Sequence, residues 1–203
     1  MGCRDKNESG GCPRMSRRSF VGSMGAAAAA TQLGVFNFAS SLFAAPEKRG
    51  KPTVRTAFVR PDVERYHMGW PGADWDNPVH QEHYTKILKG AADDLDVDLR
   101  LEENLVENKA AATKLLNKVK KEQPDGLILV CMSLNHAWPH INRICKERGD
   151  IPTIVFSPVG TSFTAHLQPT RDIDGVFVGA AADEEWLATG LRMLDTKWQM
   201  ANT

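Results

Sequence analysis

Three short segments of this sequence carry the polar and aromatic side chains best suited to recognising a ligand. The first, residues 60–77, contains two of the five tryptophans, and its candidate residues are Arg60, Trp70, Trp75 and Asp76. A flat aromatic ring packs on the C–H face of a sugar, while carboxylate, amide and guanidinium groups hydrogen-bond its hydroxyls. The segment therefore predicts a site for a polyhydroxylated ligand. The alternative is that Trp70 and Trp75 pack the segment onto the domain or onto an oligomer partner.

The second and third segments each follow a run of apolar residues. They are 133–136, after Leu127–Met132, and 157–162, after Ile151–Phe156. The candidate ligand-binding residues here are Asn135, His136, Ser157, Gly160 and Thr161.

Histidine spacing raises a metal site as another interpretation. One pair, His80 and His83, is three residues apart, and His136 and His140 are four apart, so each pair could share a helix face. Neither pair has a nearby cysteine, and the His-Glu-x-x-His motif is absent. The phosphate-binding loop, the Gly-x-Ser-x-Gly elbow and a dinucleotide-binding glycine motif are also missing from the sequence. We therefore expect loop histidines rather than a metal site, and assign no catalytic residue.

The spacing of apolar residues predicts the elements that position these segments. Alternation and continuous apolar runs predict strands, and apolar residues three and four apart predict helices between them. Residues 61–77 and the stretch after 157 are expected to be irregular, and Asp183 is expected to cap the last helix. The predicted strands are 53–59, 97–101, 127–132, 151–156 and 175–179, and the helices lie within 84–95, 112–119, 138–148 and 183–198.

Strands that alternate with helices predict an α/β fold: a three-layer sandwich with a parallel, flavodoxin-like sheet. In such a sheet the loops that follow the strands gather at the carboxyl edge, where ligands bind. The three candidate segments each follow a strand. We therefore expect them to lie along one edge and to form one site.

Charge and cysteine content exclude some classes of protein. The chain has 25 basic and 25 acidic residues, and residues 47–203 hold 20 basic and 23 acidic ones. A domain without a basic excess is a poor candidate for nucleic-acid binding. Cys131 and Cys145 are too few for a disulfide framework, and we expect both to be small buried apolar residues.

The amino-terminal region is typical of an export signal. Ser16-Arg17-Arg18 followed by Phe20 resembles the twin-arginine motif, and no charged residue occurs between Ser19 and Pro46. This predicts a signal region over residues 1–46, with Met15 as the true start, cleavage near Ala44-Ala45, and a linker over 47–51. The resemblance implies transport by the Tat translocase and a periplasmic or extracytoplasmic location. An uncleaved membrane anchor is the alternative.

Further motifs resemble a known family. Gly69-Trp70-Pro71-Gly72 with Asp76, Lys121–Leu129 and Ile151–Phe156 together look like the amino-terminal part of the L-fucose/L-arabinose isomerase-like superfamily. The resemblance implies a sugar ligand and, in the full-length family, a divalent metal such as Mn²⁺. No segment here matches the family's metal ligands, so no cofactor is expected in this chain. Residues 52–203 are then expected to be the first part of a longer protein that is not catalytically competent alone.

Two interpretations of function stay open. One is an exported sugar isomerase-like protein or fragment. The other is a non-catalytic lobe of the kind found in periplasmic sugar-binding proteins, which share the Asp-Gly-strand and Ile-Pro-strand pattern. Both imply a small carbohydrate partner, and a homo-oligomer is compatible with either.

Overall fold

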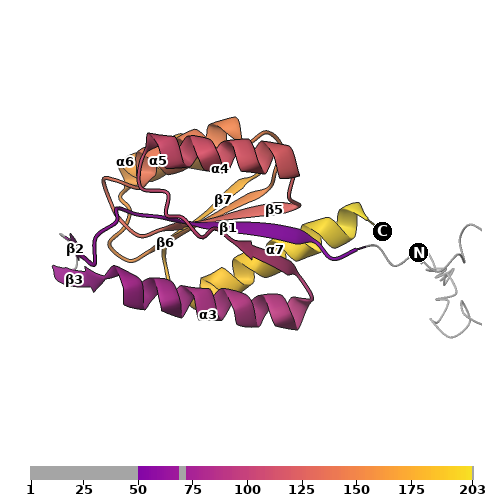
Figure 1. Cartoon of the computed structure of the whole chain (residues 1–203), viewed down its shortest axis with the longest axis horizontal. Helices are drawn as coiled ribbons and strands as arrows, with labels where there is room; N and C mark the ends of the chain where they lie inside the picture. Colours follow the sequence, from indigo (N-terminus) through magenta and orange to yellow (C-terminus); the bar gives the residue numbers. More distant parts are fainter. Residues whose placement is uncertain (1–49, 69–71, 203) are drawn as a thin grey trace, which may run out of the picture. The chain divides into compact units, whose positions relative to one another are not determined.

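A computed structural model describes residues 50–68 and 72–202. The predicted twin-arginine signal region, with its Met15 start and cleavage point, lies outside the described residues, as does Trp70. The described chain forms an α/β domain (Figure 1). In chain order the elements are β1 (Thr53–Val59), β2 (Arg65–Met68), β3 (Ala73–Asp76), α3 (Asn77–Leu95), β4 (Asp98–Leu101), α4 (Lys109–Glu122), β5 (Gly126–Cys131), α5 (Trp138–Glu147), β6 (Thr153–Pro158), α6 (Thr164–Arg171), β7 (Val176–Ala182) and α7 (Glu185–Ala201).

Five strands form a parallel sheet in the order β4-β1-β5-β6-β7. Numbered along the chain within this sheet, the order is 2-1-3-4-5, which is the flavodoxin-like arrangement. The predicted fold class is confirmed. Strand order reverses between β1 and β5, so the carboxyl ends of these two strands flank the switch point, where α/β sheets bind ligands.

Helices cover both faces of the sheet, as Figure 1 shows, with α4, α5 and α6 on one side and α3 and α7 on the other. Each interface has its own apolar core, because alternate residues of a strand point to opposite faces. Ala57 and Val59 of β1 join the core beneath α4 and α5, whereas Val54 and Phe58 join the one against α3 and α7. The central strands β5 and β6 are buried along their whole length, as the continuous apolar runs predict.

Capping residues define where these helices begin and end. Asp76 caps α3, its carboxylate accepting a hydrogen bond from the Val79 N–H at 3.1 Å. Asn108 caps α4 in the same way, through the Ala111 N–H at 2.9 Å. The end of α4 at Glu122 follows from Gln123, which adopts a left-handed conformation with φ of 46°.

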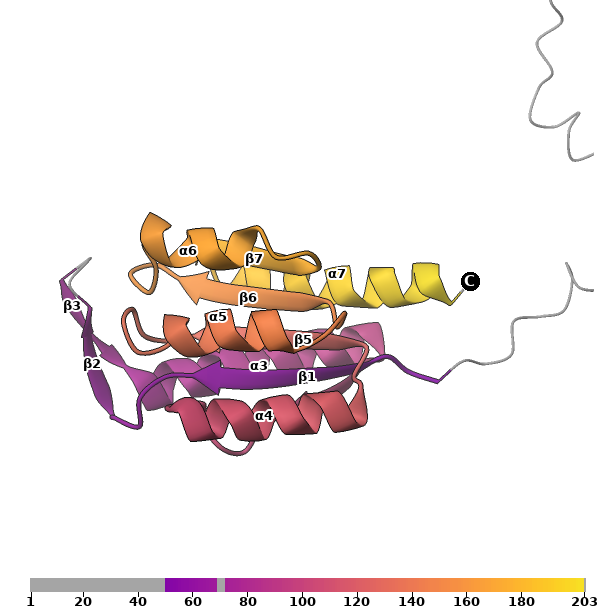
Figure 2. The same ribbon diagram turned by 90° about the horizontal axis from the view of Figure 1, so that it is seen from above.

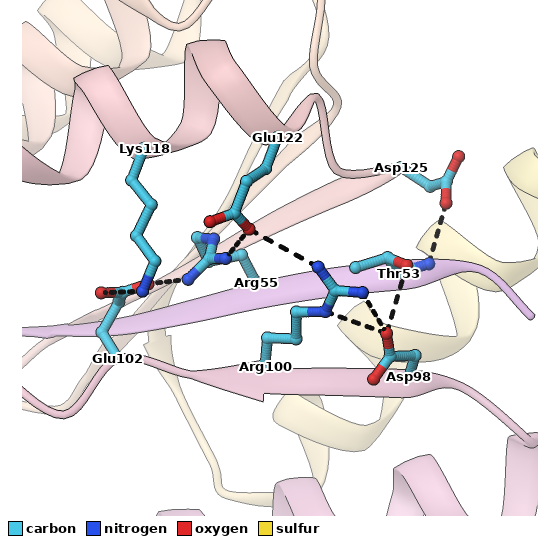
Figure 3. Close-up of polar contacts among 8 residues, drawn as sticks. All are labelled: Thr53, Arg55, Asp98, Arg100, Glu102, Lys118, Glu122 and Asp125. Atoms are coloured by element: carbon cyan, nitrogen blue, oxygen red, sulfur yellow. Dashed lines mark hydrogen bonds and ion pairs between the residues drawn. The ribbon is translucent and has the colours of Figure 1, made fainter.

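A cluster of charged side chains lies between α4 and the strands β1 and β4, where apolar core residues would usually pack. Arg55 of β1 points toward α4 and pairs with both Glu102 and Glu122, although its side chain is only 3% exposed. Lys118 also pairs with Glu102, at 3.0 Å, and Arg100 reaches Glu122 at 3.5 Å (Figure 3). These contacts join β1, β4 and α4 through charge rather than through apolar packing.

Three expectations about local structure are wrong. Residues 61–77 are not irregular but contain the antiparallel hairpin β2–β3. The stretch after β6 contains α6, a short helix with Pro169 inside it. The last helix is capped by Glu184 without a side-chain hydrogen bond, not by Asp183. The hairpin and α6 are short and mostly not buried, so apolar periodicity gave little signal there.

The two cysteines of the described chain are free and buried, as expected. Burial raises the pKa of both thiols to about 12. Within residues 50–68 and 72–202, no helix is both long and apolar enough to span a membrane.

Candidate functional site

The loops that follow β1, β5, β6 and β7 lie at one edge of the sheet, because these strands are parallel. The hairpin β2–β3 extends beyond the ends of the β1 and β6 strands at this edge (Figure 2). It also contacts the switch-point loop, since the Leu134 N–H donates to the hydroxyl of Tyr66 at 3.2 Å. We refer to the hairpin together with these four loops as the carboxyl rim.

At the first loop, Arg60 is turned into the protein. It is 7% exposed, and its Nε donates to the side chain of Gln81 at 2.9 Å. Its Nη1 donates to the carbonyls of Pro61 and Val63, at 3.0 and 3.3 Å. Burial lowers the pKa of this guanidinium, with the nearby Asp62 acting in the opposite direction. In this conformation Arg60 holds the loop that leads into the hairpin.

In the hairpin, Trp75 stacks on His80 of α3, with ring centroids 3.6 Å apart and planes 11° apart. Asp76 is engaged as the α3 cap, so one of its carboxylate oxygens already accepts a backbone hydrogen bond. Burial, followed by the proximity of His83, lowers the pKa of His80. The His80 imidazole stacked on the Trp75 indole makes a flat, partly buried platform at the start of α3.

The loop after β5 presents the most accessible polar groups among the candidates. Asn135 and His136 are both exposed, and they lie two and three residues after the buried Ser133. The loop after β6 is different, because its candidates bond to one another. The hydroxyls of Ser157 and Thr161 are 2.9 Å apart, and the Thr161 hydroxyl donates to the Pro158 carbonyl at 2.7 Å.

A tight turn holds this β6 loop in place. Gly160 has φ of 85°, a left-handed conformation that favours glycine, and the Thr161 N–H closes the turn onto the Pro158 carbonyl at 3.1 Å. The carbonyl of Thr161 accepts a hydrogen bond from the indole N–H of Trp138 at 2.7 Å. The loop after β6 is therefore tied to the start of α5. The side chains of Ser157 and Thr161 are fully buried.

Three buried polar atoms at the carboxyl rim lack a hydrogen-bond partner among the described residues. They are the Ser133 hydroxyl and the Trp75 indole nitrogen, together with the side-chain oxygen of Asn77, the first residue of α3 after the hairpin. A buried group without a partner costs about 1–3 kcal/mol. Groups of this kind are tolerated where they serve another purpose, such as contact with a ligand.

Neither Ser133 nor the contact between α3 and the end of β7 is among the residues predicted for the site. There, His83 of α3 is hydrogen-bonded to Glu184 at the start of α7. A serine directly after a buried strand at the switch point is a signal that could have singled out Ser133. Nothing in the spacing of His83 and Glu184, 101 residues apart, indicates their contact.

The chemistry that this rim offers is hydrogen bonding and stacking. Across residues 50–68 and 72–202, no three His, Cys, Asp or Glu side chains are grouped to hold a metal ion. The divalent metal implied by the isomerase resemblance thus has no matching ligand set in this part of the chain, and we derive no step through it.

Surface hollows of this domain also occur away from the rim. One of about 370 Å³ lies beside β4 and α3, lined in part by Lys51 and Asp93. Another of about 470 Å³ lies between the turn at Pro124-Asp125, the one at Gly149-Asp150, and the end of α7. Both are near the amino ends of the strands. They therefore lack the converging strand-end loops that build sites in this fold.

Comparisons with known proteins show a weak structural similarity. No known family matches the chain, and no curated protein matches it. Solved structures do match, among them the RpiR transcription factor of Sphaerobacter thermophilus (its sugar isomerase domain). That likeness covers 75% of this chain and 72% of that one, at 12% sequence identity and a TM-score of 0.35. We draw nothing about function from a likeness this weak, and the fold class rests on the strand order. Membership of the L-fucose/L-arabinose isomerase-like superfamily stays a prediction.

Proposed function

We propose that this domain binds a small carbohydrate at the carboxyl rim, as part of an exported sugar isomerase-like protein. The observation that carries the proposal is the group of unpartnered buried polar atoms at this edge, above all the Ser133 hydroxyl at the switch point. Exposed Asn135 and His136, two and three residues further along the same loop, supply donors and acceptors for further sugar hydroxyls. The Trp75–His80 platform supplies the flat surface that sugar C–H groups prefer.

The proposal assigns binding to this domain and leaves hydrogen transfer to residues elsewhere in a longer polypeptide. Three of the predicted residues hold the loops in place rather than contact the sugar, because their polar groups already form hydrogen bonds within the loops. They are Arg60, Ser157 and Thr161. The contacts to the sugar then come from the exposed residues and from Ser133. Sugar isomerases need both a binding surface and a group that moves hydrogen, and only the first is proposed here.

The test is a calorimetric titration of the full chain with a panel of aldoses and ketoses, run beside thermal unfolding. A sugar that binds the folded state raises the unfolding midpoint. Ser133→Ala should weaken that sugar about three- to tenfold, the worth of one hydrogen bond. It should leave the free protein at least as stable, because the substitution removes an unsatisfied hydroxyl.

Thr56→Val is the matched control. Thr56 also has a fully buried hydroxyl without a partner among the described residues, but it lies within β1 rather than at the rim. Its replacement should leave affinity unchanged. If no sugar in the panel binds, carbohydrate recognition is excluded. If a sugar binds but Ser133→Ala matches the parent protein, the site lies elsewhere.

Export is a separate part of the proposal and has its own test. Replacing Arg17 and Arg18 with lysine should retain the chain in the cytoplasm of a bacterium with a Tat system, because that pathway reads the paired arginines. Cell fractionation measures the outcome. Equal amounts of parent and variant outside the cytoplasm would contradict twin-arginine export.

A further inference from the structure

The two edges of the sheet differ in how they are protected. At one edge, β4 carries Asp98 and Arg100, which pair with each other at 2.7 Å and place charge along the strand. At the other edge, β7 has the sequence Val-Phe-Val-Gly-Ala-Ala-Ala, seven residues without a charge or a proline. Proteins usually protect a free edge with charges, prolines or a covering element, because its unpaired backbone groups can join another strand. Among residues 50–68 and 72–202, β7 therefore has none of these protections.

The backbone of β7 shows which residues face outward. The Gly175 carbonyl accepts a hydrogen bond from the Thr153 N–H of β6 at 2.8 Å, so Gly175 faces β6. Along a parallel strand, the N–H and C=O of one residue both point to one side, and those of the next residue point to the opposite side. Val176 and Val178 therefore direct these groups away from the sheet. The Val176 N–H is already used, because it donates to the Ile173 carbonyl at 3.1 Å. Within the described chain, Val178 is thus the first residue of β7 whose N–H and C=O are both available, and Ala180 follows it by the same alternation, next to the register shift at the end of the strand.

Apolar side chains surround this free edge. Phe177 is 50% exposed and stacks on Trp186 of α7, with ring centroids 5.8 Å apart. Met193 of α7 is 38% exposed. Phe177, Met193 and the stem of Lys197 line a hollow of about 230 Å³ between β7 and α7. A large exposed aromatic residue next to a free edge indicates a contact surface.

The outward stripe of α7 is self-complementary in charge. Glu185, Thr189, Met193, Lys197 and Met200 follow one another at helical spacings of three or four residues. An acidic residue thus stands near the start of the stripe and a basic one near its end. Two copies of such a stripe that run in opposite directions place unlike charges together.

We propose that a second copy of this chain pairs with β7 in antiparallel fashion, about a two-fold axis at Val178. The two Val178 residues then form a hydrogen-bonded pair, and the two sheets become one continuous sheet. In this register Phe177 faces the partner's Gly179, on which the partner's Trp186 ring packs. Both α7 helices lie on the same face and antiparallel, so Glu185 approaches the partner's Lys197.

The spacing between the two helices agrees with the apolar residues available to fill it. Gly190 packs α7 closely over Ile154 of β6, so the paired helices are separated by three strand spacings, about 14 Å. Helices in direct contact are closer, about 8–10 Å apart. The remaining gap is the place where Phe177 and Met193 of both copies lie. A second copy of the chain thus accounts for the exposure of both Phe177 and Met193.

The test measures the mass of the full chain by sedimentation velocity over a concentration series. The parent chain should sediment as a dimer that dissociates on dilution. Val178→Pro removes the outward N–H without touching a bond to β6, and edge strands tolerate proline. It should raise the dimer dissociation constant at least about tenfold, from the loss of two symmetry-related hydrogen bonds. Val178→Thr keeps the N–H and is the matched control. Circular dichroism checks that each variant is folded.

Charge reversal supplies a second, independent measurement. Glu185→Lys and Lys197→Glu should each weaken the dimer, and the double variant should recover the parent dissociation constant. A parent chain that sediments only as a monomer would overturn the proposal. So would a dimer that is insensitive both to Val178→Pro and to charge reversal, because the interface would then lie elsewhere.

Discussion

Replacing Arg55 should destabilise this domain more than any other single change of charge in the cluster of Figure 3. Its side chain is 3% exposed, and it pairs with Glu102 and Glu122. Removing one partner of a buried ion pair costs about 3–5 kcal/mol, because the other charge is left without compensation. Here both carboxylates keep a second cation, at Lys118 and Arg100. We therefore expect Arg55→Met to cost about 3 kcal/mol, at the lower end of that range.

Urea denaturation, followed by circular dichroism, measures this cost as a shift of the transition midpoint. Arg100→Met is the matched control, since that side chain is 46% exposed and its loss should change stability far less. In the double variant Arg55→Met/Glu102→Met, an apolar pair replaces the ionic one, and most of the lost stability should return. A change below about 0.5 kcal/mol in Arg55→Met, the size typical of surface substitutions, would refute the burial of this charge. So would a double variant as unstable as the sum of the two single ones.

The pH dependence of the same variant gives a further check. Burial alone would raise the pKa of Glu122, but its hydrogen bond and charge interaction with Arg55, aided by Lys118 and Arg100, outweigh burial and lower the pKa below 4.5. A carboxyl whose pKa is lower in the folded state than in the unfolded state stabilises the fold at any pH above its unfolded-state pKa. This stabilisation is lost as the pH falls through the folded-state pKa. The difference between parent and Arg55→Met should therefore shrink in acid, below about pH 4. A difference that is constant over the acid range would contradict this assignment.

Three more outcomes follow from the packing and the ionisation of single residues. Burial, followed by the proximity of His83, lowers the pKa of His80 below 6.5, so the unfolded state binds more protons at this residue. The stability of the domain should therefore fall as the pH is lowered from about 7 to about 5. Thermal unfolding should show a smaller fall in His80→Gln. Gly179→Ala should cost about 1–3 kcal/mol in urea, because its Cβ would overlap the Trp186 ring. Gly90→Ala, on the open side of α3, should instead stabilise by about 0.5–1 kcal/mol, and equal effects of the two would contradict the packing. The two buried cysteines, with pKa raised to about 12, should stay unlabelled by a thiol reagent at pH 8 until the domain unfolds, as peptide mass mapping would show.

Long elements with a clear periodicity could be predicted without coordinates. The alternation in β1 and the apolar runs of β5 and β6 identify these strands, since a strand buried on both faces has no polar side to display. The face of α4 that carries Leu115, Leu116 and Val119 identifies that helix. These elements alternate along the chain, and that is enough to define the α/β class and the edge at which the loops meet.

Short exposed elements could not be predicted in this way. The strands of the β2–β3 hairpin are four residues each and largely polar, and α6 buries only Thr170. Their conformation depends on contacts made after the chain has folded. One such contact is the hydrogen bond between Leu134 and Tyr66.

The sequence by itself determined the layers of this domain, the parallel sheet and the set of loops from which a ligand site can be built. Those features follow from apolar periodicity, which is local. Tertiary structure alone decided which polar side chains of those loops remain available. It turned Arg60 inward onto loop carbonyls and paired Ser157 with Thr161, while it left the Ser133 hydroxyl buried without a partner in the described chain. A side chain's hydrogen-bond partners come from distant segments, so the same residue type can support a loop or face a ligand.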